Sequence, residues 1–230
     1  RTDMRRESST IVALVGRVSG AQLAALTESP NVSVVRLPAS APAPASASEQ
    51  PGTRTSLATS GTGESLPAAL PGWEHGARAM REAAQRRSTY VVVADDPLAG
   101  VAAAWRAMWE VGSGPEAVAM FEERAGDTLT AWRQNKFELP DYYLVVAPAQ
   151  DSTTGPDLYL GPLRAARPRR VAVAVGADHD NPAGISPTAS LLDTLRSLGQ
   201  GPWWPPLDEL VDAARKFYAG GLAESQQAPV

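Results

Sequence analysis

The sequence contains no cysteine. This absence excludes disulfides, thiolate metal sites and cysteine nucleophiles together. Long apolar runs are also missing, since no segment approaches the roughly 18 consecutive apolar residues of a membrane-spanning helix. Residues 1–7 carry charge but no apolar stretch of signal-peptide length. We therefore expect a cytoplasmic protein without membrane attachment.

Basic residues do not outnumber acidic ones. The chain has 21 lysines and arginines against 25 aspartates and glutamates, for a formal net charge of −4. A nucleic-acid-binding protein normally presents a basic excess, so we do not expect a nucleic-acid partner. Single-stranded nucleic-acid binding would rest only on residues 14–17, which are similar to the first strand of some OB-folds, and the helix expected next argues against it. Hydrophobic residues make up 43% of the chain, which is enough for a packed core.

Apolar runs of strand length alternate with segments of helical spacing. Continuous apolar runs predict buried strands, and they lie at residues 11–15, 90–94, 142–146 and 171–175, while residues 32–35, Val-Ser-Val-Val, show an extended pattern and predict a further strand. Apolar positions three or four apart predict helices, and they lie at residues 19–29, 74–87, 97–109, 118–132, 191–198 and 207–217. We therefore predict an α/β fold, in which a mostly parallel sheet of the Rossmann-like or flavodoxin-like kind carries helices on both faces.

Composition divides the chain into four parts. Residues 8–37 form a short strand-helix-strand unit, whose helix of about three turns is marginal for a parallel crossover. Residues 38–72 are rich in Ala, Ser, Pro, Thr and Gly and predict a flexible linker. Residues 73–222 form the α/β domain, whose last helix is expected to stop at Gly220-Gly221, and residues 223–230 form a disordered tail. The pattern leaves open whether the first unit joins the main sheet.

Polar residues follow three of the predicted strands. They are Asp95 and Asp96 after residues 90–94, Gln150 and Asp151 after residues 142–146, and Asp178, His179 and Asp180 after residues 171–175. In a parallel sheet these groups would share the carboxyl edge, where open α/β sheets bind ligands. Carboxylate oxygens suit Mg²⁺ or Mn²⁺, so Asp95, Asp96, Asp178 and Asp180 are candidate metal ligands. The alternative is structural, because aspartates also terminate strands and cap helices.

The two histidines and one glycine-containing stretch are the remaining candidates for a catalytic or binding site. His179 stands between two acids and is either a base or ligand or a solvated loop residue, and His75 begins a helix and is interpreted as structural. Residues 58–65 superficially resemble a phosphate-binding loop, but Ala58 replaces the first glycine, Glu64 replaces the lysine and no apolar strand precedes them. We therefore predict no catalytic residue, and no cofactor other than the candidate Mg²⁺ or Mn²⁺.

Six tryptophans are many for this length. Trp105, Trp109 and Trp132 fall on apolar helix stripes and predict core packing. Trp203 and Trp204 differ, because prolines flank the pair and restrict its backbone. A stiff loop could present both rings to a protein partner or to a second copy of the chain, or fold them back onto the sheet. We predict that at least one of the two rings is exposed in the isolated chain.

Two segments carry a partial resemblance to a known family. Residues 90–98, Tyr-Val-Val-Val-Ala-Asp-Asp-Pro-Leu, resemble the opening of a response-regulator receiver domain, where an acidic pair after the first strand holds Mg²⁺. Residues 205–214 resemble the final Lys-Pro turn and last helix of a receiver. The likeness covers about 30 residues, and Pro205 stands where a receiver has its lysine. Val146-Ala147 stand in place of the phospho-acceptor aspartate, and Gly176-Ala177 in place of the conserved Thr or Ser. The resemblance implies a degenerate receiver-like domain that is not phosphorylated.

Two functions remain open from the sequence. The first is a non-catalytic α/β interaction or regulatory module in a multiprotein assembly, with Trp203 and Trp204 as partner-binding residues. The second is a divalent-metal-dependent enzyme that acts on a phosphorylated small molecule or a nucleotide through the acidic carboxyl edge. The first is favoured because no phosphate loop, nucleophile elbow, dinucleotide glycine motif or histidine cluster is present.

Overall fold

The computed structural model describes residues 9–16, 18–37, 72–110, 114–147, 157–175, 187–199 and 201–227. The predicted linker therefore lies almost wholly outside the described residues, which resume at Gly72. Among the described residues, no helix combines the length and the apolar character needed to cross a bilayer.

Five strands form one sheet in which every neighbouring pair is parallel. In chain order they are β1 (Thr10–Gly16), β2 (Val32–Val35), β3 (Tyr90–Val93), β4 (Tyr142–Ala147) and β5 (Val171–Val175). Across the sheet the order is β2-β3-β1-β4-β5. The predicted α/β fold with a parallel sheet is thus confirmed, as continuous apolar strands covered on both faces require.

The N-terminal unit supplies the centre of the sheet. β1 pairs with β3 on one side and with β4 on the other, and β2 forms the edge beyond β3. The crossover through α1 (Gly20–Glu28) therefore does not join adjacent strands, because β3 fits between β1 and β2. Compared with the Rossmann order 3-2-1-4-5, β2 and β3 exchange places.

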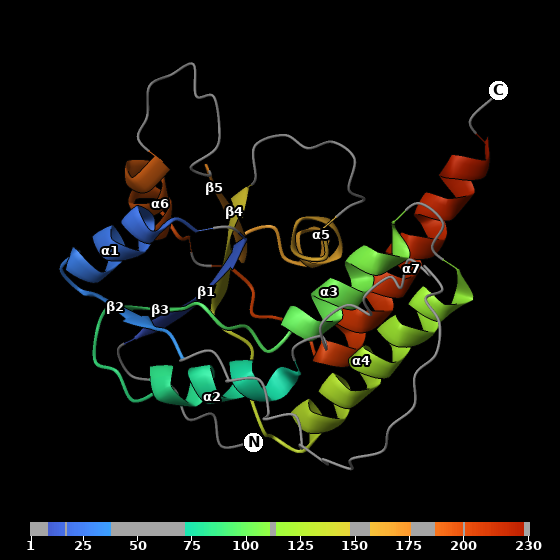
Figure 1. Cartoon of the computed structure of the whole chain (residues 1–230), viewed down its shortest axis with the longest axis horizontal. Helices are drawn as coiled ribbons and strands as arrows, with labels where there is room; N and C mark the ends of the chain where they lie inside the picture. Colours follow the sequence, from blue (N-terminus) through green and yellow to red (C-terminus); the bar gives the residue numbers. More distant parts are fainter. Residues whose placement is uncertain are drawn as a thin grey trace, which may run out of the picture.

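Helices cover both faces of the sheet (Figure 1). On one face α1 and α6 (Pro187–Arg196) pack on the side chains of Val12, Leu14 and Leu144 through Leu26, Leu191 and Leu195. The other face carries α2 (Trp73–Ala83), α3 (Ala99–Met108), α4 (Pro115–Arg133), the π-helical turn η1 (Tyr159–Leu163), the short α5 (Arg164–Ala166) and α7 (Leu207–Gln227). Successive residues of β1 alternate between the two cores, as the period of a strand requires.

The helix boundaries show which sequence signals begin or end a helix in this chain. Ser19 caps α1 through a capping box in which its side chain accepts from the Gln22 backbone N–H and the Gln22 side chain accepts from the Ser19 N–H. Gly126 does not break α4, and the glycine pair in α7 does not end that helix, which continues to Gln227 and so into the predicted tail. Gly221 has a packing reason: a Cβ there would lie 2.7 Å from the Trp109 ring.

The helix tryptophans belong to the core, as predicted. Trp105 is fully buried, and Trp109 and Trp132 are partly buried and pack against the same cluster. Trp105 contacts Trp109 and Phe121 with tilted or edge-on rings, at centroid distances of 5.7 Å in both cases. Such tilted and edge-to-face pairs are favourable aromatic geometries.

Candidate functional site

The acidic edge is described only at β3. Asp95 and Asp96 directly follow this strand, whereas Gln150, Asp151, Asp178, His179 and Asp180 lie outside the described residues. The two described carboxylates have different partners, one inside the fold and one near its surface. No group of three or more His, Asp or Glu residues within the described ranges is placed to hold a metal ion.

Asp96 is buried in a cluster of hydroxyl donors. Tyr143 donates to one carboxylate oxygen at 3.0 Å, and Tyr159 donates to the other at 2.5 Å. The Leu98 N–H donates to the same carboxylate. Tyr143 lies on β4 and reaches Asp96 over β1, where its register partner is the small, fully buried Ala13. The small side chain of Ala13 leaves room for the ring of Tyr143 to extend over β1 toward Asp96.

Burial dominates the acid–base behaviour of this cluster. It raises the pKa of Asp96 to about 6, although the three donors act in the opposite direction. Burial, followed by the charge of Asp96, also raises the pKa of Tyr143 and of Tyr159 well above the usual value. Both tyrosines therefore keep their protons and donate. Because both oxygens of Asp96 already accept hydrogen bonds inside the core, the carboxylate is a structural acceptor in this conformation.

Asp95 lies nearer the surface and joins two distant parts of the chain. One oxygen accepts from the Leu37 N–H at 3.2 Å, and the other lies 3.4 Å from His75 Nε2. Leu37 is the last described residue before the 38–71 segment, and His75 lies in the first turn of the helix after it. Asp95 thus fastens the two ends of that segment to the end of β3, and His75 has the structural part expected of it.

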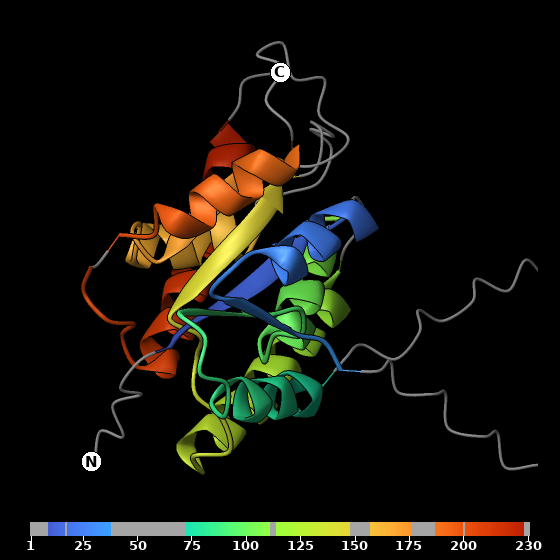
Figure 2. The ribbon, with the colours of Figure 1, turned by 90° about the vertical axis from the view of Figure 1, so that its left-hand side faces the viewer.

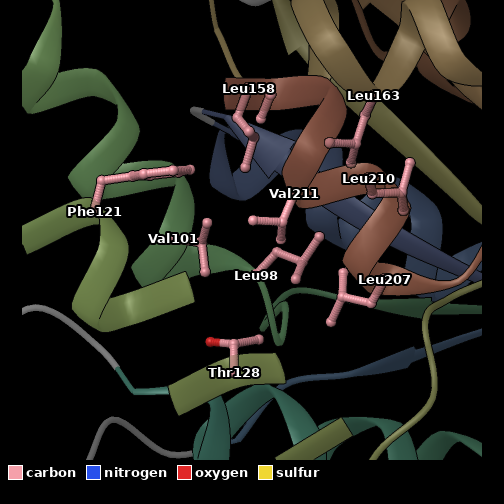
Figure 3. Close-up of a pocket in the computed structure, with 10 residues that line it drawn as sticks. Leu98, Val101, Phe121, Thr128, Leu158, Leu163, Leu207, Leu210 and Val211 are labelled. Carbon is pink, nitrogen blue, oxygen red and sulfur yellow. The ribbon is translucent and has the colours of Figure 1, made fainter. Parts of the chain in front are cut away.

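The apolar pocket between the helices does not have the size of a ligand site (Figure 3). Its lining is apolar except for Thr128 and comes from α3, α4, α7 and the η1 region: Leu98, Val101, Phe121, Leu158, Leu163, Leu207, Leu210, Val211 and Ala214. The volume inside is about 10 Å³, close to the space of a single water molecule. We interpret it as imperfect packing between helices.

The loop between α6 and α7 carries Trp203 and Trp204 and lies on the outside of the molecule (Figure 2). Arg170, which directly precedes β5, fixes this loop. It is 5% exposed, and its guanidinium donates to the carbonyl oxygens of Gly201 and Pro202 and to that of Asp141. The guanidinium carbon also lies 4.8 Å from the ring centroid of Tyr142 and 4.4 Å from that of Trp203. The guanidinium of Arg170 therefore lies between the rings of Tyr142 and Trp203, and its N–H groups donate to backbone carbonyls.

Trp203 is the most exposed large apolar side chain among the described residues, at 63%. One face of its ring stacks on Arg170, a favourable cation–π geometry. Its carbonyl accepts from Arg167 Nε at 2.6 Å. The ring is thus held in place and still open to solvent, as predicted for at least one member of the pair.

The ring of Trp204 packs toward the core, whereas that of Trp203 is exposed to solvent. Its Nε1 donates to the Pro140 carbonyl at 2.8 Å, and its ring packs edge-on against Tyr143 at 5.6 Å between centroids. Trp204 therefore anchors the loop to the core. The two adjacent tryptophans, considered as one pair in the sequence, have separate parts in the structure.

Arginines gather around Trp203. Arg167 bonds to its carbonyl, Arg170 stacks on its ring, and the side chain of Arg169 lies against Gly201 in the same loop. None of the three forms an ion pair with an acidic side chain in the ranges that the structure describes. We call Trp203 with these three arginines the Trp203 surface.

Sequence reasoning missed Arg170, Tyr143 and Tyr159. In the sequence Arg170 is the second residue of the pair Arg169-Arg170, and no neighbouring residue indicates that its side chain is buried. Tyr143 and Tyr159 lie 47 and 63 positions from Asp96, a separation that no local pattern bridges.

Comparison with known proteins gives no relative. No protein-family model matches this chain, and no curated protein or solved structure is significantly similar to it.

Proposed function

We propose that this protein is a non-catalytic α/β interaction module of the cytoplasm that works in a multiprotein assembly and binds a protein partner through the Trp203 surface. The observation that carries the proposal is the 63% exposure of an indole whose ring stacks on the buried Arg170. Tryptophan and arginine are the residues most enriched among interface hot spots. A ring whose position is already fixed loses little conformational freedom when it binds.

The packing under the loop supports the same role. Arg170 joins the loop to β4 and β5, and Trp204 joins it to Tyr143 and Pro140. The exposed ring therefore rests on the central sheet through the contacts of buried Arg170 and half-buried Trp204. A binding residue placed on a rigid scaffold keeps its geometry, whereas one on an unsupported loop must be ordered each time it binds.

A Trp203-dependent selection tests this function. A random peptide library displayed on phage is panned against the full chain and, in parallel, against Trp203→Ala. We expect peptides that bind the wild-type chain and lose at least about tenfold in affinity, or about 1.4 kcal/mol, on Trp203→Ala. Phe217→Ala is the matched control, because it truncates another exposed aromatic ring, at 37% exposure, on α7. Peptides that bind the wild type and both variants equally would contradict the proposal.

The competing enzyme function stays a prediction. It requires Asp178 and Asp180, which lie outside the described residues, to meet Asp95 and Asp96 around Mg²⁺ or Mn²⁺. The contacts of Asp95 and Asp96 do not favour it, because these two carboxylates accept from separate donors. The resemblance to a receiver domain also stays a prediction.

A further inference from the structure

We infer that the segment bound at the Trp203 surface is acidic, with carboxylates on Arg167 and Arg169 and an apolar side chain against the open face of Trp203. This inference rests on the proposed function and names the chemistry of the partner. It begins from a local imbalance of charge. The whole chain has a net charge of −4, yet residues 164–170 hold four arginines and no acid.

Most surface arginines with a described partner form ion pairs within this chain. Arg86 pairs with Glu82, Arg215 with Glu122 and Asp212, Arg196 with Asp193, Arg133 with Asp208, and Arg106 with Asp157. Around Trp203, Arg167 and Arg170 use carbonyls and a ring in place of acids, and Arg169 has no acidic partner among the described residues. Their positive charge is therefore uncompensated in the part of the chain that the structure describes.

The free donors point to the kind of group that would complete the surface. Arg167 uses Nε on the Trp203 carbonyl and Nη1 on the Ala166 carbonyl, which leaves Nη2 without a protein acceptor among the described residues. Arg169 is exposed and touches Gly201 through its aliphatic stem. Carboxylates are the strongest common acceptors for such guanidinium groups, with geometry that a neutral amide does not match.

An acidic protein segment fits better than a nucleic acid. The arginines occupy one short loop region and not a groove or stripe that could follow a phosphate backbone. The acidic balance of the remaining chain would repel a long polyanion, whereas a short acidic segment meets only the local positive field. Trp203 also offers a single open ring face, because Arg170 covers the other.

The experiment starts from peptides selected on the full chain in a Trp203-dependent manner. One selected peptide is resynthesised with every Asp and Glu replaced by Asn and Gln, and both forms are titrated into the full chain by fluorescence anisotropy at low and high salt. We expect the acidic form to bind at least about tenfold more tightly than the amide form, and high salt to remove most of that difference.

Protein variants give the reciprocal measurement. Arg167→Gln with Arg169→Gln should weaken the acidic peptide about tenfold and leave the amide peptide within about twofold. Arg78→Gln is the matched control for Arg169→Gln alone, because each removes one positive charge from an exposed position and Arg78 lies on α2, at the β2-β3 end of the sheet. Circular dichroism on each variant checks that Arg167→Gln keeps the fold, because this variant loses a hydrogen bond to the Trp203 carbonyl. Arg169→Gln alone removes a positive charge and loses no hydrogen bond to the loop.

The outcomes separate this inference from the proposed function. Trp203-dependent peptides that are neutral, or whose affinity ignores salt and Arg169, would overturn the acidic partner and leave the interaction module standing. Absence of any Trp203-dependent peptide overturns both. Binding of an oligothymidylate probe that depends on Trp203 and exceeds the peptide affinity would replace the acidic segment by a nucleic acid. Self-association of the wild-type chain that Trp203→Ala abolishes would replace it by a second copy.

Discussion

The guanidinium carbon of Arg170 lies 4.4 Å from the ring centroid of Trp203, so a buried cation supports the most exposed apolar ring among the described residues. The same guanidinium donates to three backbone carbonyls. The geometry of the exposed surface therefore depends on a residue that a partner would hardly touch.

Substitution of Arg170 tests this support. Arg170→Lys keeps the charge but presents no planar fork that can reach three carbonyls and stack between two rings. We expect a loss of about 3 kcal/mol in the free energy of unfolding, because three hydrogen bonds from a buried side chain to part-buried carbonyls are lost, at about 1 kcal/mol each. Urea denaturation measures it, with Arg169→Lys at an exposed position as the control, expected within about 0.5 kcal/mol of wild type. Equal stability of the two variants would contradict the role given to Arg170.

The two adjacent tryptophans should separate in stability. Trp204→Ala removes a ring packed on Tyr143 and a hydrogen bond to Pro140, and we expect it to cost at least about 3 kcal/mol. Trp203→Ala removes a largely exposed ring and its stacking on Arg170, for which we expect about 1 kcal/mol or less. Chemical denaturation of the single variants measures both. A larger loss for Trp203 than for Trp204 would reverse the assignment.

Asp96 should make stability depend on pH. The pKa of Asp96 in the fold is about 6, above the ordinary aspartate value of 3.8, so the folded state binds this proton more tightly than the unfolded state. Its contribution is fully present below pH 3.8 and is lost as the pH rises through about 6, for a total of about 3 kcal/mol. The stability of wild type relative to Asp96→Asn should therefore fall by that amount between these limits. Unfolding across this range measures the difference, and a flat difference would show that Asp96 is not desolvated.

Gly76 should tolerate no side chain. A Cβ at this position of α2 would lie 2.2 Å from the Pro97 nitrogen and 2.3 Å from the Asp96 carbonyl carbon. We expect Gly76→Ala to destabilise the fold by at least about 2 kcal/mol, because backbone must move. Gly126→Ala is the matched control in α4, where nothing lies within 4 Å, and it should stabilise by roughly 0.5–1 kcal/mol. Thermal unfolding of both variants measures these opposite signs.

The sheet could be predicted from the sequence because four of its five strands carry a continuous apolar run, and only β2 is interrupted, by Ser33. Val91, Val92 and Val93, for example, bury their side chains in both cores, and only a strand covered on both faces requires that pattern. The strand order could not be predicted, since β1 pairs with strands far along the chain. Its apolar sequence also carries no signal that distinguishes one neighbouring strand from another. The glycines of α7 misled for a related reason: the ring of Trp109, which occupies the space beside Gly221, comes from another helix.

The candidate site divides in the same way. The exposure of one indole follows from a proline-flanked loop, a local feature of the chain. The split between Trp203 and Trp204 depends on Arg170, Pro140 and Tyr143, three residues that only the folded sheet brings beneath the loop. Likewise, an aspartate after a strand predicts an edge position, but its burial under Tyr143 requires the small Ala13 on the strand between them.

The central position of β1 has a consequence for synthesis on the ribosome. This strand emerges early, yet its partners on both edges, β3 and β4, follow about 80 and about 130 residues later. At about 5–20 residues per second, the run Ile11-Val12-Ala13-Leu14 waits on the order of ten seconds before both of its edges can be paired. During that interval the nascent chain exposes the most apolar segment of its future core, so we expect chaperone binding to concentrate there and to end when β4 is released.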